Sequence, residues 1–224
     1  MGGPLTRSDP AAGPKSRRRL HSEGVPIVPR PNVEAQRREQ ILSAACEVIA
    51  DIGMQSLRMT DVAKRAGVSS GTIHYYFESK RDVINAAFEL NYERSLQSRR
   101  ELLEDHHTDA LTTLRDLAIS YLPVTDESIR AWRVWAELWA QGMRDETLQE
   151  INSRLYGQWR DLVRMLVEGG QRRGQIVDGD AVELADNLVA MIDGMSVQNL
   201  MRLPEMTLER MLDRVNAYVD ALAA

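Results

Sequence analysis

The sequence predicts an all-α protein, and three observations carry that prediction. Apolar residues recur at spacings of three and four from Val33 almost to the end of the chain, as on the buried face of a helix. Alternating strand patterns and internal repeats are not evident. Glycine and proline separate the periodic segments, for example at Gly53, Pro123 and Pro204. A length of 224 residues allows one large domain or two small ones.

The first helix is marked by one apolar face that ends near Gly53. This face consists of Ile41, Ala45, Val48, Ile49 and Ile52. A short helix is expected over 60–66 with Thr60 as its N-cap, and a second one over 70–76. Ser79 and Asp82 form an S-x-x-D start, which predicts a long helix from there to about Glu104.

The rest of the chain reads as further helices separated by short breaks. The expected ranges are 109–122, 126–143, 146–170, 181–201 and 207–222. Pro123 ends the first of these, and Asp180 with Glu183 resembles a capping start for the fourth.

Several classes of protein are disfavoured by composition. The chain has no run of 18 apolar residues and no secretory signal, so we expect neither a membrane span nor a membrane partner. The single Cys46 cannot form an internal disulfide, and we therefore expect a cytoplasmic protein. His106 and His107 are adjacent and point apart on a helix, so no metal site is predicted. Without a phosphate loop, zinc pattern or nucleophile elbow, we expect no enzyme and no cofactor.

Charge is divided unequally along the chain. Residues 1–81 hold 13 basic and 8 acidic residues, whereas residues 82–224 hold 15 basic and 25 acidic ones. Residues 1–32 contain six prolines and the run Arg17–Arg19 and are expected to be a disordered basic arm. One end of the protein is therefore expected to meet a polyanion.

The segment Ala66–Phe77, "AGVSSGTIHYYF", interrupts the apolar pattern with hydroxyls and aromatic rings. Gly67 permits the left-handed turn that ends one helix, and Ser69 can cap the next. Ile73 and Phe77 are the core positions of the second helix, which leaves its other face free to touch a DNA groove. The pair of short helices is thus a helix-turn-helix candidate.

The longer stretch "TDVAKRAGVSSGTIHYYFESKRDV" resembles the DNA-binding signature of the TetR family of bacterial transcriptional regulators. The resemblance implies a three-helix DNA-binding domain at 33–80, a ligand-binding and dimerisation domain at 81–224, and a homodimer that leaves double-stranded operator DNA when a small molecule binds. Phosphate-contacting positions of the family match Thr60, Ser69, Thr72, Tyr75, Tyr76 and Lys80. Base-facing positions match Ser70, Gly71 and His74. Ser70 stands where many members have lysine, and His74 where tyrosine is common.

The C-terminal part resembles the BetI-like subgroup through "WAELWAQGMRDETLQEINSRLYGQWRDLVRMLVEGG" and "LADNLVAMIDGMSVQNLM". All four tryptophans lie here, and rings at helical spacing either pack as core or line a pocket. The candidate ligand-binding residues are Trp132, Trp135, Trp139, Trp159, Met143 and Asp193. Glu137 is a further carboxylate near them. Aromatic faces beside a carboxylate suit a cationic effector.

Two consecutive C-terminal helices carry apolar stripes that a single helix pair would leave half exposed. The second stripe is Leu208, Met211, Leu212, Val215, Tyr218, Val219 and Leu222. These stripes predict a homodimer held by a four-helix bundle. The alternative to a ligand-responsive repressor is a helical partner-binding or scaffold protein that no longer binds DNA. Ser70 and the acidic total favour that alternative, whereas Lys80 and the basic arm favour the repressor.

Overall fold

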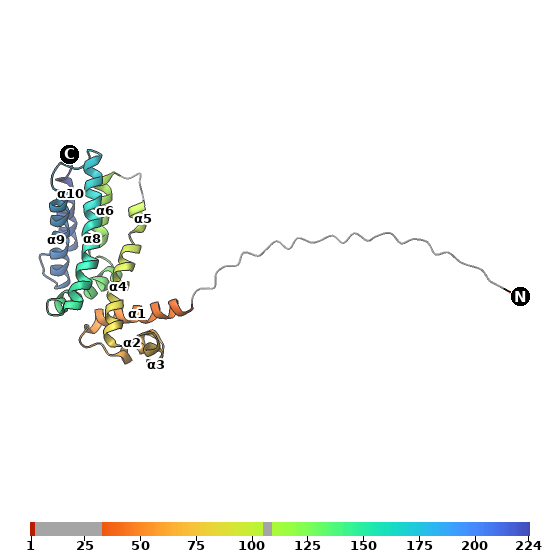
Figure 1. Ribbon diagram of the computed structural model, residues 1–224. Coiled ribbons are helices and arrows are strands. Elements are labelled where there is room, and N and C mark those ends of the chain that lie inside the picture. Colours follow the sequence, from red (N-terminus) through yellow and green to blue (C-terminus); the bar gives the residue numbers. More distant parts are fainter. Residues whose placement is uncertain (3–32, 105–108) are drawn as a thin grey trace. The chain divides into compact units, whose positions relative to one another are not determined.

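The structure is a computed structural model that describes residues 1–2, 33–104 and 109–224 (Figure 1). The predicted basic arm, including Arg17–Arg19, and the pair His106–His107 lie outside the described residues. The described residues 33–104 and 109–224 belong to one compact unit. Its helices are α1 (Val33–Ile52), α2 (Met59–Ala66), α3 (Ser70–Tyr76), α4 (Lys80–Gln97), α5 (Arg100–Glu104), α6 (Ala110–Tyr121), α7 (Asp126–Gly142), α8 (Glu146–Arg172), α9 (Ala181–Leu200) and α10 (Leu208–Asp220).

Side-chain caps fix most of the helix starts that the sequence predicts. Ser69 Oγ accepts from the Thr72 N–H at the start of α3. Ser79 and Asp82 form a complete capping box at the start of α4. Asp180 accepts from two N–H groups at the start of α9. Each cap satisfies backbone donors that a helix leaves without a partner, so the short polar residues determine where these helices begin.

The prediction that Thr60 caps the second helix is wrong. The helix begins one residue earlier, at Met59, and its N-cap is Arg58, whose side chain makes no capping hydrogen bond. The Arg58 carbonyl accepts from the N–H groups of Asp61 and Val62, so the helical pattern is already established before Thr60. Thr60 is an exposed residue of the first turn instead.

The long helix expected from Ser79 to Glu104 is interrupted. Helix α4 ends at Gln97, and α5 starts after a two-residue turn at Ser98 and Arg99. The side chains of Ser98 and Arg99 both donate to the Ser95 carbonyl. This oxygen would otherwise accept from the backbone N–H of Arg99, which bonds to Leu96 O instead. Local side-chain hydrogen bonds thus compete with the helical ladder and break it.

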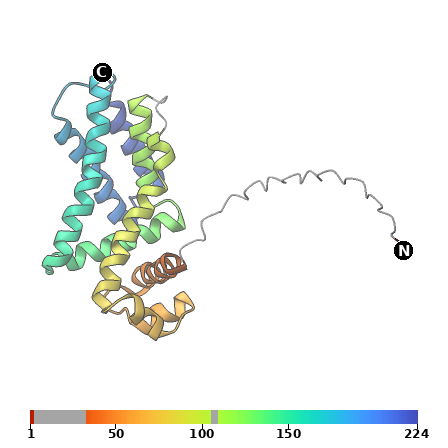
Figure 2. The ribbon, with the colours of Figure 1, turned by 45° about the vertical axis from the view of Figure 1, so that its right-hand side comes forward.

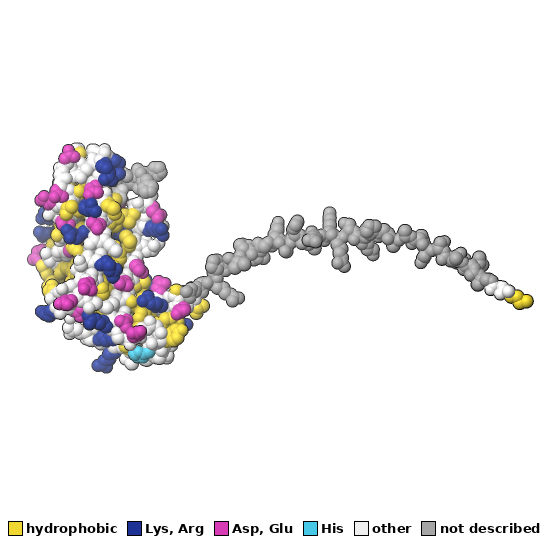
Figure 3. Space-filling model, viewed as in Figure 1, with side chains coloured by type: hydrophobic (Ala, Val, Ile, Leu, Met, Phe, Trp, Pro, Cys, Tyr) yellow, Lys and Arg dark blue, Asp and Glu magenta, His cyan; other side chains and the backbone are white. Residues whose placement is uncertain are grey.

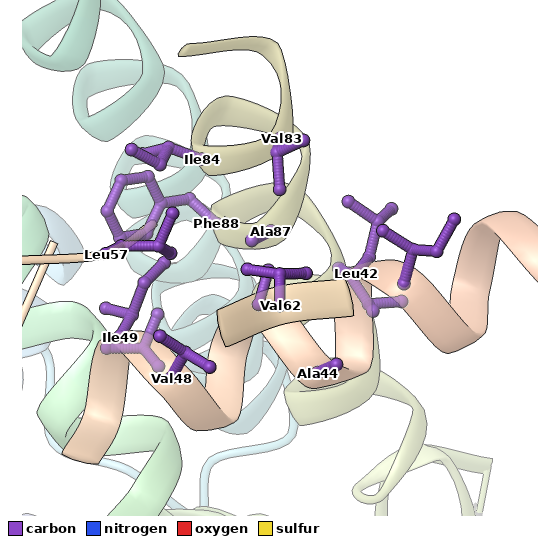
Figure 4. Packing of buried hydrophobic residues seen from close by; sticks show 14 of the residues in the cluster. Leu42, Ala44, Val48, Ile49, Leu57, Val62, Val83, Ile84, Ala87 and Phe88 are labelled. Carbon is purple, nitrogen blue, oxygen red and sulfur yellow. The ribbon is translucent and has the colours of Figure 1, made fainter. Parts of the chain in front are cut away.

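One core joins the helix-turn-helix to the rest of the unit. Figure 4 shows Val62 of α2 close to Leu42 and Val48 of α1, with Val83 and Phe88 of α4 beside them. The same cluster continues into α7 and α8 through Val134, Trp135, Leu138, Leu148, Ile151 and Leu155. Because α7 belongs to this core, the first three helices rest directly on the C-terminal part.

A second core lies among α6, α8, α9 and α10, which run along one another (Figures 1 and 2). Four residues of the predicted α10 stripe are fully or almost fully buried in it: Met211, Val215, Val219 and Leu222. The expectation that this stripe stays half exposed in one chain is therefore wrong, because α10 buries it against α6 and α9. Leu208 remains exposed and Leu212 half-buried.

Extended structure is minimal in the described ranges 33–104 and 109–224. The one bridge there is an isolated antiparallel pair between Ile176 and Ala223, which holds the end of the chain against the turn after α8. None of the helices in these ranges is both long and apolar enough to cross a membrane.

Candidate DNA-binding and effector sites

The turn between α2 and α3 has the geometry of a helix-turn-helix. Gly67 adopts φ +63°, a left-handed conformation that costs glycine little and other residues more. The N–H of Val68 then bonds back to Ala63 O at 3.0 Å, and the half-buried Val68 side chain packs on the first core. Ile73 and Phe77 are buried as expected, so α3 is anchored along one side only.

The opposite side of α3 is free. Gly71, His74 and Tyr75 are exposed and lie three and four residues apart, hence on one face. Tyr75 keeps 76% of its surface accessible, the largest fraction of any aromatic side chain in the described residues. A Cβ on Gly71 would meet only Ser69 Oγ, at 3.6 Å. Nothing in the fold therefore requires glycine at this position.

The predicted phosphate-contacting residues surround this face in different environments. Thr60, Ser69 and Tyr75 are exposed, while Thr72 and Tyr76 are half-buried. The Tyr76 ring packs on the first core and meets the Tyr75 ring edge-to-face at 5.0 Å. Lys80 Nζ donates to Gln55 O at 3.1 Å, which leaves two ammonium hydrogens for another acceptor.

Two basic residues near this face were missed by the sequence reasoning. Arg58 and Lys64 are exposed, and no ion pair forms at either within the described part of the chain. Their signal was present as positive charge on and just before α2, a helix that also bears Thr60. In Figure 3, Lys and Arg side chains project from the lower end, where Figure 1 places α2 and α3.

A separate group of aromatic rings lies inside the C-terminal part; we call it the aromatic cluster. It consists of Tyr121, Trp132, Trp139, Tyr156 and Trp159, from α6, α7 and α8. Tyr121 stacks on Trp159 with centroids 4.4 Å apart, and edge-to-face contacts of 5.1–6.2 Å link the other rings. Such rings contribute to the core and present polarisable faces at once.

The structure divides the predicted ligand residues. Trp132, Trp139 and Trp159 belong to the aromatic cluster. Trp135 instead packs with Tyr92 and the first core. Met143 is 75% exposed at the end of α7. Glu137 faces the DNA-binding helices, where its Oε2 accepts from the Met54 N–H at 2.9 Å.

Asp193 of α9 borders the aromatic cluster. Its Oδ2 accepts from the Tyr156 hydroxyl, while its Oδ1 is buried without a hydrogen-bond partner in the described structure. Burial raises the pKa of Asp193 to about 6, although the Tyr156 hydrogen bond opposes the shift. A buried carboxylate oxygen without a partner is costly, so this atom is suited to receive a cation or a donor from a ligand.

A buried arginine, also missed at the sequence level, lies over the ring of Tyr121, on which Trp159 also stacks. Arg99 is 6% exposed, and its guanidinium carbon is 5.0 Å from the Tyr121 centroid. Arg99 lies in the mostly polar segment Ser95–Arg100, in which no periodic pattern marks one arginine as buried. It lies in the turn between α4 and α5 and donates hydrogen bonds to Ser120 of α6.

Comparison with known proteins is consistent with both regions. Residues 41–87 match the model of bacterial regulatory proteins of the tetR family, and residues 110–224 match the BetI-type transcriptional repressor C-terminal model. A regulator named HTH-type transcriptional regulator BetI from Stenotrophomonas maltophilia is 29% identical over 201 residues, which cover 86% of this chain and 96% of that one.

Solved structures agree. A putative transcriptional regulator from Saccharomonospora viridis, determined in complex with choline, is 28% identical with a TM-score of 0.73 and covers 83% of this chain and 96% of its own. A putative TetR-family regulator from Rhodococcus is 26% identical with a TM-score of 0.76, covering 85% and 100%. The chain therefore belongs to the TetR family of DNA-binding transcriptional regulators and carries a BetI-type C-terminal domain.

Proposed function

We propose that this protein represses transcription as a homodimer in the cytoplasm and leaves its operator DNA when a small cation occupies the aromatic cluster. In this proposal residues 33–80 form the DNA-binding domain and residues 81–224 the effector-binding and dimerisation domain. The observation that carries it is that one helix, α7, contributes to both regions. Trp132 and Trp139 of α7 belong to the aromatic cluster, and Glu137 of α7 binds the turn after α1.

The contacts of α7 with the DNA-binding helices are specific. Gly53, with φ +82°, ends α1, and Glu137 Oε1 lies 3.3 Å from the position of a Cβ there. Gln141 accepts from Gln55 at 2.9 Å, and Lys80 donates to the Gln55 carbonyl. A shift of α7 on effector binding thus changes the support of α2 and α3, and the two recognition helices of a dimer no longer fit successive major grooves about 34–36 Å apart.

A cation is the effector class that the aromatic cluster favours. A ring face attracts a desolvated cation by up to about 2 kcal/mol, and Asp193 supplies a carboxylate with one free oxygen. The Saccharomonospora viridis relative was solved with choline, itself a quaternary ammonium. We therefore extend a choline-like effector to this chain. The effector-binding residues in this proposal are Trp132, Trp139, Trp159 and Asp193, together with Trp135, which lines a cavity with Trp159, and Met143 at the end of α7.

The DNA contacts proposed from the family are those on and around α3. Gly71 and His74, with half-buried Ser70, face bases, while Thr60, Ser69, Thr72, Tyr75, Tyr76 and Lys80 contact phosphates. Arg58 and Lys64 add positive charge at the same end. The phosphate contacts proposed for these neighbouring residues do not require a lysine in place of Ser70.

The dimer surface in this proposal is the outer face of α9. Ala190 and Gly194 are exposed one turn apart, and a Cβ on Gly194 would meet nothing within 4 Å. Small residues allow the helix of a second chain to approach closely. Exposed Met201, Leu203 and Leu208 extend the apolar surface beyond the end of α9.

The test measures binding of the protein to DNA from upstream of its own gene, by fluorescence anisotropy, with and without choline. We expect specific binding that choline weakens at least tenfold. Glu137→Ala should retain choline binding but lose the effect of choline on DNA, whereas the exposed control Glu150→Ala should retain both. Specific DNA binding that no cation alters would contradict the effector proposal, and absence of DNA binding would favour the scaffold alternative.

Dimerisation is tested separately by light scattering after gel filtration. We expect the wild type to have twice the chain mass and Ala190→Arg to have the mass of one chain, because a long charged side chain cannot be buried in a close helix contact. Met165→Arg, exposed on α8, is the matched control and should leave the dimer intact.

A further inference from the structure

Arg99 is a buried cation, and within the described residues Glu127 acts on its charge only from beyond ion-pair distance. Its Nε donates to Ser120 Oγ at 3.0 Å and its Nη2 to Ser120 O at 2.8 Å. Its Nη1 donates to the carbonyl and hydroxyl of Ser95. No carboxylate forms an ion pair with Arg99 in the described structure. Burying a charge is costly unless it is paired, so the neutral oxygens only partly compensate this guanidinium.

Unused donors accompany this charge. Four of the five guanidinium N–H groups are engaged, which leaves one on Nη2. The indole N–H groups of Trp135 and Trp159 are buried and have no hydrogen-bond partner in the described structure. Both tryptophans and Arg99 line one small cavity of about 20 Å³, together with Tyr121 and Tyr156. A set of donors without acceptors is what a ligand oxygen would satisfy.

A carboxylate lies behind one wall of the same cavity. Tyr156 lines it, and the Tyr156 hydroxyl donates to Asp193, whose second oxygen is unpaired. The cavity holds about one water, but a cleft of about 490 Å³ lies beside it between α1, α4, α6 and α7. The cavity and the cleft share four lining residues, Ser95, Arg99, Tyr121 and Trp135, so these residues lie at the boundary between the two. A ligand that enters from the cleft therefore has to displace Arg99 or one of the other three shared residues.

These charges distinguish three classes of effector. A simple cation is attracted by Asp193 but repelled by Arg99, which already occupies one face of Tyr121. A simple anion is attracted by Arg99 but repelled by Asp193. A molecule with both charges gains from both residues, because its anionic group can take the free donors while its ammonium remains near Asp193 and the rings.

We propose that the effector is dipolar, with an alkylated ammonium group placed by the aromatic cluster and Asp193 and a carboxylate or phosphate group placed by Arg99. This inference rests on the proposed function and names the chemical class that the effector site selects. The tertiary structure brings the two charges together from α9 and from the break between α4 and α5.

The first experiment compares ligands by isothermal titration calorimetry on the full chain. The probes are choline, trimethylammonio carboxylates with one to four methylenes between the charges, phosphocholine and butyrate. We expect at least one dipolar probe to bind tenfold or more tightly than both choline and butyrate. Choline binding as tightly as every dipolar probe would overturn this inference and leave the proposed function intact. Binding of no probe would overturn both.

The second experiment uses Arg99→Gln, which keeps a hydrogen-bonding side chain but removes the charge. We expect the dipolar probe to bind at least tenfold more weakly and choline to bind about threefold more tightly, because repulsion is removed. A merely structural role would weaken both. Arg100→Gln, which alters an exposed pair with Glu104, is the matched control and should change neither. If Arg99→Gln does not fold, Arg99→Lys serves instead, and loss of the dipolar preference despite the retained charge would overturn the inference.

Discussion

The recognition face of α3 and the aromatic cluster both contain aromatic side chains, but α3 exposes them and the cluster buries them. On α3, His74 and Tyr75 are exposed and contribute nothing to the core, since Ile73 and Phe77 hold the helix in place. In the aromatic cluster, Trp132 and Trp159 are buried, so the same rings that would meet an effector also hold α6, α7 and α8 together. A substitution on the recognition face of α3 is therefore expected to change DNA binding without changing stability. A substitution in the aromatic cluster is expected to change both effector binding and stability.

The largest expected effect comes from truncating a ring that the cluster shares with the core. Trp159→Ala should lower the free energy of unfolding by about 3–5 kcal/mol, because it removes a stacked, buried ring and leaves a cavity. Tyr75→Ala should change it by less than about 0.5 kcal/mol. Urea denaturation followed by circular dichroism measures both. Equal losses for the two variants would contradict the comparison.

The second-largest expected effect is a loss of preference for operator DNA over random DNA. His74→Ala should narrow the difference in binding free energy between operator and random DNA by about 1–3 kcal/mol, the range for one base contact. Thermal stability should not change, since His74 is exposed. Anisotropy titrations with both DNAs at one salt concentration measure the gap. An unchanged gap would show that His74 does not contact a base.

The same contrast explains what the sequence could predict. Caps at Ser69, Ser79 and Asp180, the glycine turn at Gly67 and the buried Ile73 and Phe77 all depend on neighbours within a few residues, and all are confirmed. The TetR signature is local as well, so the family was predictable. The boundary after Gln97 was not, because Arg99, which takes part in the break, is held by Ser120 of the separate helix α6.

Tertiary contacts account for the remaining differences. The sequence grouped Trp132, Trp135 and Trp139 in one candidate site, yet Trp135 packs with the first core because α7 contacts both cores. The stripe of α10 was read as a dimer surface, although α6 covers it within one chain. Arg99 and Tyr121 meet only in the folded chain, and no spacing rule relates residues on separate helices.

A smaller effect is expected when pH changes the charge of the cluster. The pKa of Asp193 is raised to about 6 from an ordinary value near 4, so folding favours the protonated carboxyl. The destabilisation from its buried charge is absent below pH 4 and fully present above pH 6. Cation binding needs the carboxylate, so choline affinity should fall about tenfold per unit as pH drops below 6, at about 1.4 kcal/mol per unit.

Asp193→Asn should remove this pH dependence and weaken choline at pH 7.5. Asp186→Asn, which alters the pair with Arg160 on the outer side of α8 and α9, should keep it. Calorimetry between pH 5 and 8 measures the profile. A profile that is the same in the wild type and in Asp193→Asn would assign the titration to another group.

The smallest effect is expected at the edge of the recognition face, at Lys80. Its ammonium is partly exposed and donates to Gln55 O, so Lys80→Ala costs little stability, less than about 1 kcal/mol. If Lys80 contacts one phosphate, the substitution should weaken operator and random DNA equally and reduce the slope of log affinity against log salt by about 0.9. Lys80→Arg should preserve the slope, because the charge remains. Arg210→Ala should also preserve the slope, because this exposed arginine belongs to α10, which packs in the second core and not with the DNA-binding helices. Tyr76→Phe removes a neutral hydroxyl while keeping the ring on the core, and so should weaken both DNAs equally without changing the slope. A Lys80→Ala variant with the wild-type slope would place Lys80 off the DNA and leave it only as a support for the turn after α1.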